Sequence, residues 1–257
     1  MSVVDAELEP ELNVWLAKHF PDLDRHVEPA TPDDIAAMER YAGRPLPRFY
    51  RWFLARMGRD NAPFAARTLD FRVGRILRCY EDGTFARNSR FLVVGYETNA
   101  EFSEHFVYDF DHPARDDARL AAMSPYDDEP DWPVGYETFR DFFVQMVFYQ
   151  YLLAEREQQV VFTLEAEEGG AVHRHADPIL ASLGFVSPVA MGPYARFYES
   201  GHQAAITSAS LDPPGPSRVR VRVGCDTVHG ARAIMDRLAA HEALTVRRVR
   251  WEPELDA

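Results

Sequence analysis

The chain has little cysteine and no long apolar run, and both shortages limit the class of protein to which it can belong. Its two cysteines, Cys79 and Cys225, lie far apart and match no metal-binding or redox spacing. No apolar run reaches the roughly 18 residues of a membrane-spanning helix, and the first residues lack the basic start and apolar stretch of a signal peptide. These absences predict a cytoplasmic protein with no membrane partner and two ordinary thiols.

Catalytic motifs are also missing. The sequence contains no His-Glu-x-x-His, no P-loop, no Gly-x-Gly-x-x-Gly and no Gly-x-Ser-x-Gly elbow. Two clusters carry metal-liganding side chains, His173-x-His175 with Asp177 and Asp109-x-Asp111-His112. Neither supplies the three or four converging ligands of a zinc site, so both are interpreted as polar loop residues. The prediction is a protein without catalytic residues, metal or cofactor, with a glyoxalase-type metalloenzyme as a remote alternative.

What is abundant is acid, and it is unevenly spread. The net charge is −13, and residues 1–157 hold 29 acidic against 18 basic side chains, a balance of −11. The remaining residues, 158–257, hold 12 against 10 and are nearly neutral. An acidic domain repels nucleic acid and attracts basic partners over long range. Together with the chain length, this asymmetry favours two domains, 1–157 and 158–257.

Periodicity and capping signals predict an α+β first domain. Helices are expected at about 7–19, after Thr31-Pro32 and after Leu46-Pro47, ending before Pro21, Gly43 and Gly58. Short strands are expected at 91–95 and 106–110, and another within 68–77. Residues 112–135 are rich in Pro, Asp and Ala and are predicted to form a long surface connection.

The segment Tyr136 to Glu155 is predicted to be a long, unusually apolar helix. Phe139, Phe142, Phe143, Met146, Tyr149 and Leu153 form one stripe, and Val144, Phe148 and Tyr151 form another. Two apolar faces indicate burial between two bodies. The helix is therefore expected at the junction of the two domains or in a homodimer contact.

The second domain is predicted to be a small α+β sandwich. Strands are expected at about 159–166, 186–191, 194–200, 203–210, 218–224 and 244–251, and helices at about 173–183 and 227–242. This order resembles a ferredoxin-like sandwich with one extra strand, or one and a half βαβββ modules of the glyoxalase type.

The second and third helices resemble the SUKH superfamily, which includes the Smi/Knr-type regulators of fungal cell-wall synthesis. The residues that carry the resemblance are Thr31-Pro32-Asp33-Asp34-Ile35, Glu39, Gly43, Leu46-Pro47, Phe49-Tyr50, Phe53-Leu54 and Gly58. Downstream, Phe91-Leu92-Val93-Val94-Gly95, Phe106-Val107-Tyr108-Asp109 and Phe139 to Phe143 resemble the family's core strands and closing helix. The similarity covers about residues 28–145. It departs from the family at Gly58-Arg59-Asp60-Asn61 and at Glu97-Thr98-Asn99-Ala100-Glu101, where glycine-rich turns are usual.

This resemblance implies a helices-on-antiparallel-sheet fold and a binding function. Bacterial members of the superfamily are chiefly immunity proteins that bind and neutralise a cognate toxin, commonly a nuclease, and share no catalytic residues. The expected partner is therefore a basic toxin domain. The alternative is a regulatory or scaffold protein whose second domain senses a small ligand.

The candidate partner-binding site is an acidic segment with two aromatic residues. It comprises Tyr126, Asp127, Asp128, Glu129, Asp131 and Trp132. Carboxylates accelerate encounter with a basic partner, and an aromatic side chain supplies buried contact area. The competing interpretation is a solvated loop whose Trp132 packs inward.

A second candidate is an anion-binding face. Arg218, Arg220 and Arg222 alternate with valines on one predicted strand, and Arg248 and Arg250 are expected beside them on the next. Such a face could bind RNA phosphates. The slightly acidic domain and the lack of an aromatic-rich signature favour a solvated face instead, so nucleic acid is not the expected partner.

Overall fold

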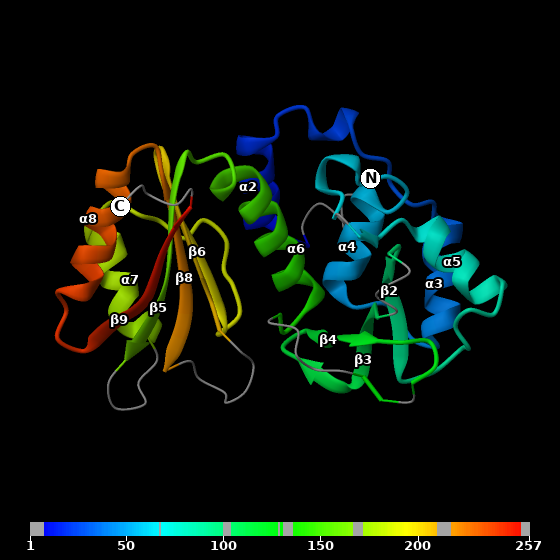
Figure 1. Cartoon of the computed structure of the whole chain (residues 1–257). Coiled ribbons are helices and arrows are strands. Elements are labelled where there is room, and N and C mark those ends of the chain that lie inside the picture. The colour runs from blue at the N-terminus through cyan, green and yellow to red at the C-terminus, as the bar shows by residue number, and fades with distance from the viewer. Residues whose placement is uncertain are drawn as a thin grey trace. The chain divides into compact units, whose positions relative to one another are not determined.

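The computed structural model describes residues 8–66, 68–99, 104–127, 129–130, 136–166, 172–209 and 217–252. The chain is of α+β class and forms two compact units, Met1–Phe142 (unit 1) and Phe143–Ala257 (unit 2), each with its own antiparallel sheet (Figure 1). The boundary between the units in the sequence lies between Phe142 and Phe143. The division at residues 157 and 158 stays a prediction.

Helices make up much of unit 1 up to residue 81. They are α2 (Pro10–His19), α3 (Pro32–Ala42), α4 (Arg48–Met57) and α5 (Val73–Glu81), with short 3-10 turns at Leu23–Arg25 and Ala62–Phe64. Thr31 and Asp34 form a reciprocal capping box at the start of α3, which satisfies two otherwise unpaired main-chain N–H groups. Gly43 ends α3 with φ of 68°, a left-handed conformation that costs glycine little.

The sheet of unit 1 has the order β1-β2-β3-β4 with all neighbours antiparallel. Its strands are β1 (Leu69–Asp70), β2 (Phe91–Glu97), β3 (His105–Ala114) and β4 (Asp117–Met123). The strand expected within 68–77 forms as the two-residue β1, and α5 follows it. The expectation of a surface connection over 112–135 was wrong, because this stretch contains the end of β3 and the whole of β4.

An aromatic core holds unit 1 together. The ring centroid of the buried Phe139 lies between 5.2 and 6.4 Å from those of Phe49, Tyr50, Phe53, Phe71 and Tyr108. These residues come from α4, from the segment after β1, and from β3, so one side chain joins the helices to the sheet. Truncating such a residue to alanine typically costs about 3 to 5 kcal/mol.

The apolar helix is shorter than expected and changes its pitch. Helix α6 spans Phe139–Phe148 and continues as one π-helical segment, η3 (Tyr149–Leu153). Its first residues belong to the core of unit 1 and its later residues to unit 2, where the Phe148 ring lies 4.5 Å from that of Phe197. The expected location of this helix at a domain junction or in a homodimer contact stays a prediction.

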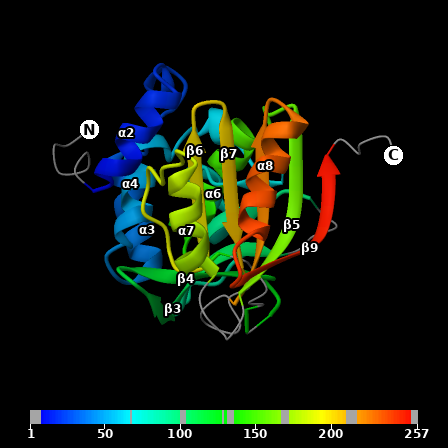
Figure 2. The same ribbon diagram turned by 90° about the vertical axis from the view of Figure 1, so that its left-hand side faces the viewer.

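Unit 2 is a five-stranded antiparallel sheet with two helices on one face (Figures 1 and 2). The strands are β5 (Gln158–Ala166), β6 (Ala195–Ser200), β7 (Gln203–Ser208), β8 (Arg218–Cys225) and β9 (Leu244–Glu252), and the helices are α7 (Val172–Ser182) and α8 (Val228–Ala239). The strand order is β6-β7-β8-β5-β9.

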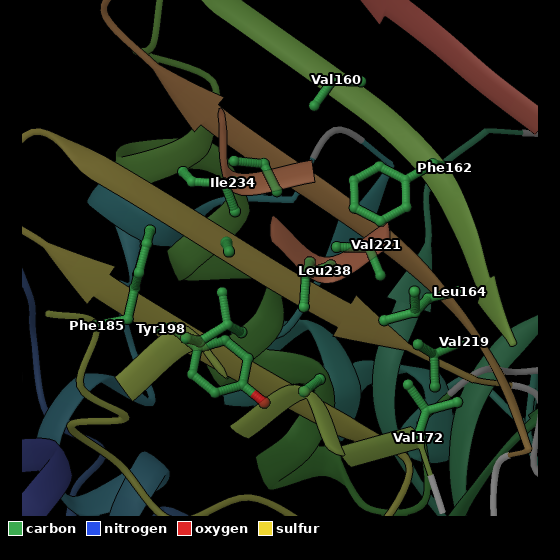
Figure 3. Packing of buried hydrophobic residues seen from close by; sticks show 14 of the residues in the cluster. Val160, Phe162, Leu164, Val172, Phe185, Tyr198, Val219, Val221, Ile234 and Leu238 are labelled. Carbon is green, nitrogen blue, oxygen red and sulfur yellow. The ribbon is translucent and has the colours of Figure 1, made fainter. Parts of the chain in front are cut away.

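Alternation along the strands places the apolar residues of unit 2 under its helices. Val160, Phe162 and Leu164 of β5 lie with Val219 and Val221 of β8 in one buried cluster (Figure 3). The cluster is closed from the helix side by residues at helical spacing, Val172, Ala176 and Leu180 on α7 and Ala231, Ile234 and Leu238 on α8. The opposite face of the sheet carries arginines of β8 and β9 together with Val161 and Thr163 of β5.

The strand expected at 186–191 does not form. Only an isolated bridge between Val186 and Glu199 is present, because Pro188 has no N–H group to continue a ladder. Within the described part of the chain, none of the helices combines the length and apolar character required to traverse a membrane.

Candidate functional site

The acidic segment follows directly from the end of β4. After Met123, the Ser124 hydroxyl accepts a hydrogen bond from the main chain of Tyr126 at 3.3 Å, and the Ser124 carbonyl accepts one from Asp127 at 3.2 Å. This turn leaves the Tyr126 side chain 91% exposed. Asp128, Asp131 and Trp132, also predicted to take part, lie outside the described residues.

Arg90 connects Glu129 to the sheet of unit 1 through hydrogen bonds. The guanidinium of Arg90, which precedes β2, donates to both oxygens of Glu129 at 3.1 Å. It also donates to Asp109 of β3 at 2.9 Å and lies 3.7 Å from Asp111. Three carboxylates thus share one arginine. We call these four residues the Arg90 cluster, and its formal charge is negative.

The buried member of the Arg90 cluster is ionised. Burial alone would raise the pKa of Asp109, but hydrogen bonds from Arg90, the main chain of Asp111 and His112 outweigh it and hold the pKa below its ordinary value. The metal candidate Asp109-x-Asp111-His112 was expected to consist of polar loop residues, but it lies in β3, where Asp109 and Asp111 contact Arg90. The acidic segment thus combines the exposed Tyr126 side chain with Glu129 of a negatively charged cluster.

The other metal candidate is a helical segment, not a loop. His173 and Asp177 of α7 point into unit 2, where the His173 Nε2 lies 2.7 Å from the Thr207 hydroxyl and Asp177 accepts from the Tyr198 hydroxyl at 2.5 Å. His175 lies beside His241 instead, with ring centroids 5.3 Å apart. Across the described residues, no group of three or more potential metal ligands occurs.

The arginine face exists, but its composition differs from the expected one. Arg222 and Arg250 lie opposite Val161 of β5, and Arg220 and Arg247 lie opposite Thr163. Arg248 and Val249 together oppose Phe162 in a β-bulge, and Arg248 adopts φ of 52°. Arg247 therefore occupies the place on this face that strict alternation assigns to Arg248.

Two carboxylates on the same face neutralise much of its charge. Glu165 accepts from Arg218 at 2.8 Å and from Arg247 at 3.0 Å. Glu252 pairs with Arg222 at 2.6 Å and also with Arg250. The sequence analysis did not include Glu165, Glu252 and Arg247 in this face. Two-residue spacing could have indicated the two acids, because Glu252 follows Arg250 on β9 and Glu165 follows Thr163 on β5. Arg222 also lies over the Tyr149 ring, 5.0 Å from its centroid.

Comparison with known proteins adds little to this geometry. The chain matches no protein-family model and no curated protein. Among solved structures it is similar to the NMR structure of PA4090 from Pseudomonas aeruginosa, at 15% identity over 38% of this chain and 98% of that chain, with a TM-score of 0.24. A score this low carries no argument about fold or function.

Proposed function

We propose that the protein binds and neutralises a cognate toxin by occluding a basic surface of that toxin with unit 1. The observation that carries the proposal is the 91% exposed Tyr126 side chain, three residues before Glu129 of the Arg90 cluster. Aromatic residues are enriched among the side chains that contribute most to binding, and charges around them mainly accelerate encounter. The −11 balance of residues 1–157 adds long-range attraction for a basic partner.

The proposal includes a finer fold assignment for each unit. Unit 1 is SUKH-like, supported by the resemblance at α3 and α4 and by helices followed by an antiparallel sheet. Unit 2 is a ferredoxin-like sandwich in which β6 is the extra strand. Its support is the order β7-β8-β5-β9 with α7 and α8 on one face. A neutralising partner acts inside the cell that makes the toxin, so we also propose a cytoplasmic location.

Co-expression with the product of the neighbouring gene tests the proposal. We expect a stable complex whose dissociation constant rises about tenfold or more in Tyr126→Ala, since truncating a central aromatic removes buried contact area. Asp127→Lys should mainly slow association. Asp236→Lys, the same charge change on α8 of unit 2, serves as the control and should leave both rates unchanged.

The experiment tests toxin binding and the location of the contact surface independently. If the neighbouring gene product does not bind, the toxin-neutralising function is wrong. If it binds with equal affinity to the wild-type protein and to Tyr126→Ala and Asp127→Lys, the function stands and the acidic segment is not the contact surface.

A further inference from the structure

A groove between the two helices of unit 2 carries a different chemistry from the acidic segment. It has a volume of about 380 Å³ and lies along α7 and the end of α8. Its polar side chains are Arg174, His175 and Ser182 from α7, Arg237 from α8, and His241 just after α8. Unlike the arginine face, it is concave, so a small molecule could contact several side chains at once.

Helical spacing explains why these residues meet. Val172, Ala176 and Leu180 of α7 are buried against the sheet, so Arg174 and His175 fall on the helix face that borders α8. Pro178 and Ile179 lie one turn further along the same face. The groove thus has a cationic portion and an apolar floor.

The two arginines of the groove differ from those of the sheet. Within the described part of the chain, neither Arg174 nor Arg237 has an ion-pair or hydrogen-bond partner for its side chain, and no carboxylate of the described residues lines the groove. The nearest acids along the chain are Asp177, which accepts from Tyr198, and Asp236, which is not among the lining residues. Two guanidinium groups remain free to bind an anion.

A main-chain contact determines the tautomer of His241, which follows α8. His241 Nδ1 accepts the main-chain N–H of Ala243 at 3.2 Å, so in the neutral ring the proton resides on Nε2. That nitrogen can donate a hydrogen bond to an anion oxygen. His175, whose ring centroid is 5.3 Å from that of His241, can supply a second imidazole.

We propose that this groove binds a small organic phosphate monoester. The two guanidinium groups match phosphate oxygens in geometry and charge, and the imidazoles add further donors. Pro178, Ile179 and Ala240 contact the organic part of the ligand. The inference concerns unit 2 alone and does not depend on the proposed toxin binding.

Calorimetric titration of the full-length protein tests this site, with inorganic phosphate and phenyl phosphate as probes. We expect saturable binding of both, with phenyl phosphate about tenfold tighter because its ring covers the apolar floor. Arg174→Gln and Arg237→Gln should each weaken phenyl phosphate binding about tenfold or more. Arg220→Gln removes the same charge from the opposite face of the sheet and should leave the affinity unchanged.

Three results would overturn the proposal. The first is that neither probe binds the wild-type protein. The second is that Arg220→Gln weakens binding as much as Arg237→Gln. The third is that inorganic phosphate binds as tightly as phenyl phosphate, since this result would assign the groove to free phosphate. NMR of the imidazole protons provides a readout that needs no variant. Phenyl phosphate should shift the signals of His175 and His241 and leave that of the buried His173 unchanged.

Discussion

At the scale of single residues, the buried side chain of His173 makes the stability of unit 2 depend on pH. Burial, followed by the nearby Arg196, lowers the pKa of His173 to about 4, while an unfolded histidine titrates near 6.5. Between about pH 4 and 6.5 the ring is therefore mainly neutral in the folded state and mainly protonated in the unfolded state. As pH falls from about 6.5 through 4, the unfolded chain gains a proton that the folded chain does not, and stability declines.

We predict that this decline is specific to His173. The wild-type protein should lose up to about 3 kcal/mol of stability through this group between pH 7.5 and pH 4. His173→Gln is less stable at pH 7.5 because its hydrogen bond to Thr207 is altered, but it lacks the titration. Urea unfolding at both pH values measures the difference. A gap between the two proteins that stays constant with pH would contradict the assignment.

Asp117 produces the opposite dependence in unit 1. Burial raises its pKa to about 7, although hydrogen bonds from Ala118 and Tyr108 act in the other direction. The folded state holds the proton more tightly than the unfolded state, whose carboxyl titrates near 3.8. The stability provided by the protonated group is complete below about pH 4 and is lost as pH rises through 7.

Asp117→Asn should therefore stabilise the protein at high pH. Asparagine resembles the protonated carboxyl and cannot ionise, so we expect the variant to exceed the wild type by a few kcal/mol at pH 8 and to match it at pH 4. Thermal unfolding at the two pH values is the measurement. A variant less stable than the wild type at pH 8 would show that the ionised carboxylate is preferred in the fold.

At the scale of elements, the end of α3 depends on one backbone angle. A Cβ atom added at Gly43 would meet only the Arg87 Nη2 atom, at 3.9 Å, so space is not limiting. The φ of 68° is limiting. We predict that Gly43→Ala lowers the free energy of unfolding by about 1 kcal/mol and Gly43→Asn by less, because asparagine tolerates the left-handed conformation. Equal denaturation midpoints for both variants and the wild type would refute this.

Elements with local signals were predictable from sequence, and these include α3 and most strands, such as β2, β5 and β8. An element without such a signal was not predictable. Thr31, Pro32 and Gly43 identify α3 from neighbours in the chain alone. Strand β4 has no such signal, because Asp117-Ala118-Arg119-Leu120-Ala121-Ala122-Met123 lacks β-branched and aromatic residues and is a strand through its pairing with β3. The expected connection over 112–135 failed for this reason.

The candidate sites show the same limit. Alternation predicted that Arg218, Arg220 and Arg222 share one face, and their opposition to Glu165, Thr163 and Val161 of β5 confirms it. It could not predict the bulge that replaces Arg248 with Arg247. The groove of unit 2 is lined by residues from two helices that are far apart in the sequence. It could not be predicted from the sequence because it depends on the packing of α7 against α8.

At the scale of the whole molecule, the net charge of −13 governs behaviour in solution. The isoelectric point is about 5.1, so the repulsion that keeps copies apart at neutral pH vanishes near pH 5. We predict a solubility minimum there, measured by turbidity between pH 4 and 8 at fixed ionic strength. Added salt should make the minimum shallower because it screens the charges on either side of it. A minimum above pH 6 would contradict the prediction.

The bulge in β9 also affects how neighbouring copies meet. Strand β9 is the last in the sheet order, so its outer N–H and C=O groups are available for a strand from another molecule. The irregular ladder at Arg248 makes that strand poorly shaped for pairing with a second β9. The feature that displaces one arginine from the sheet face thus also protects the open edge against aggregation.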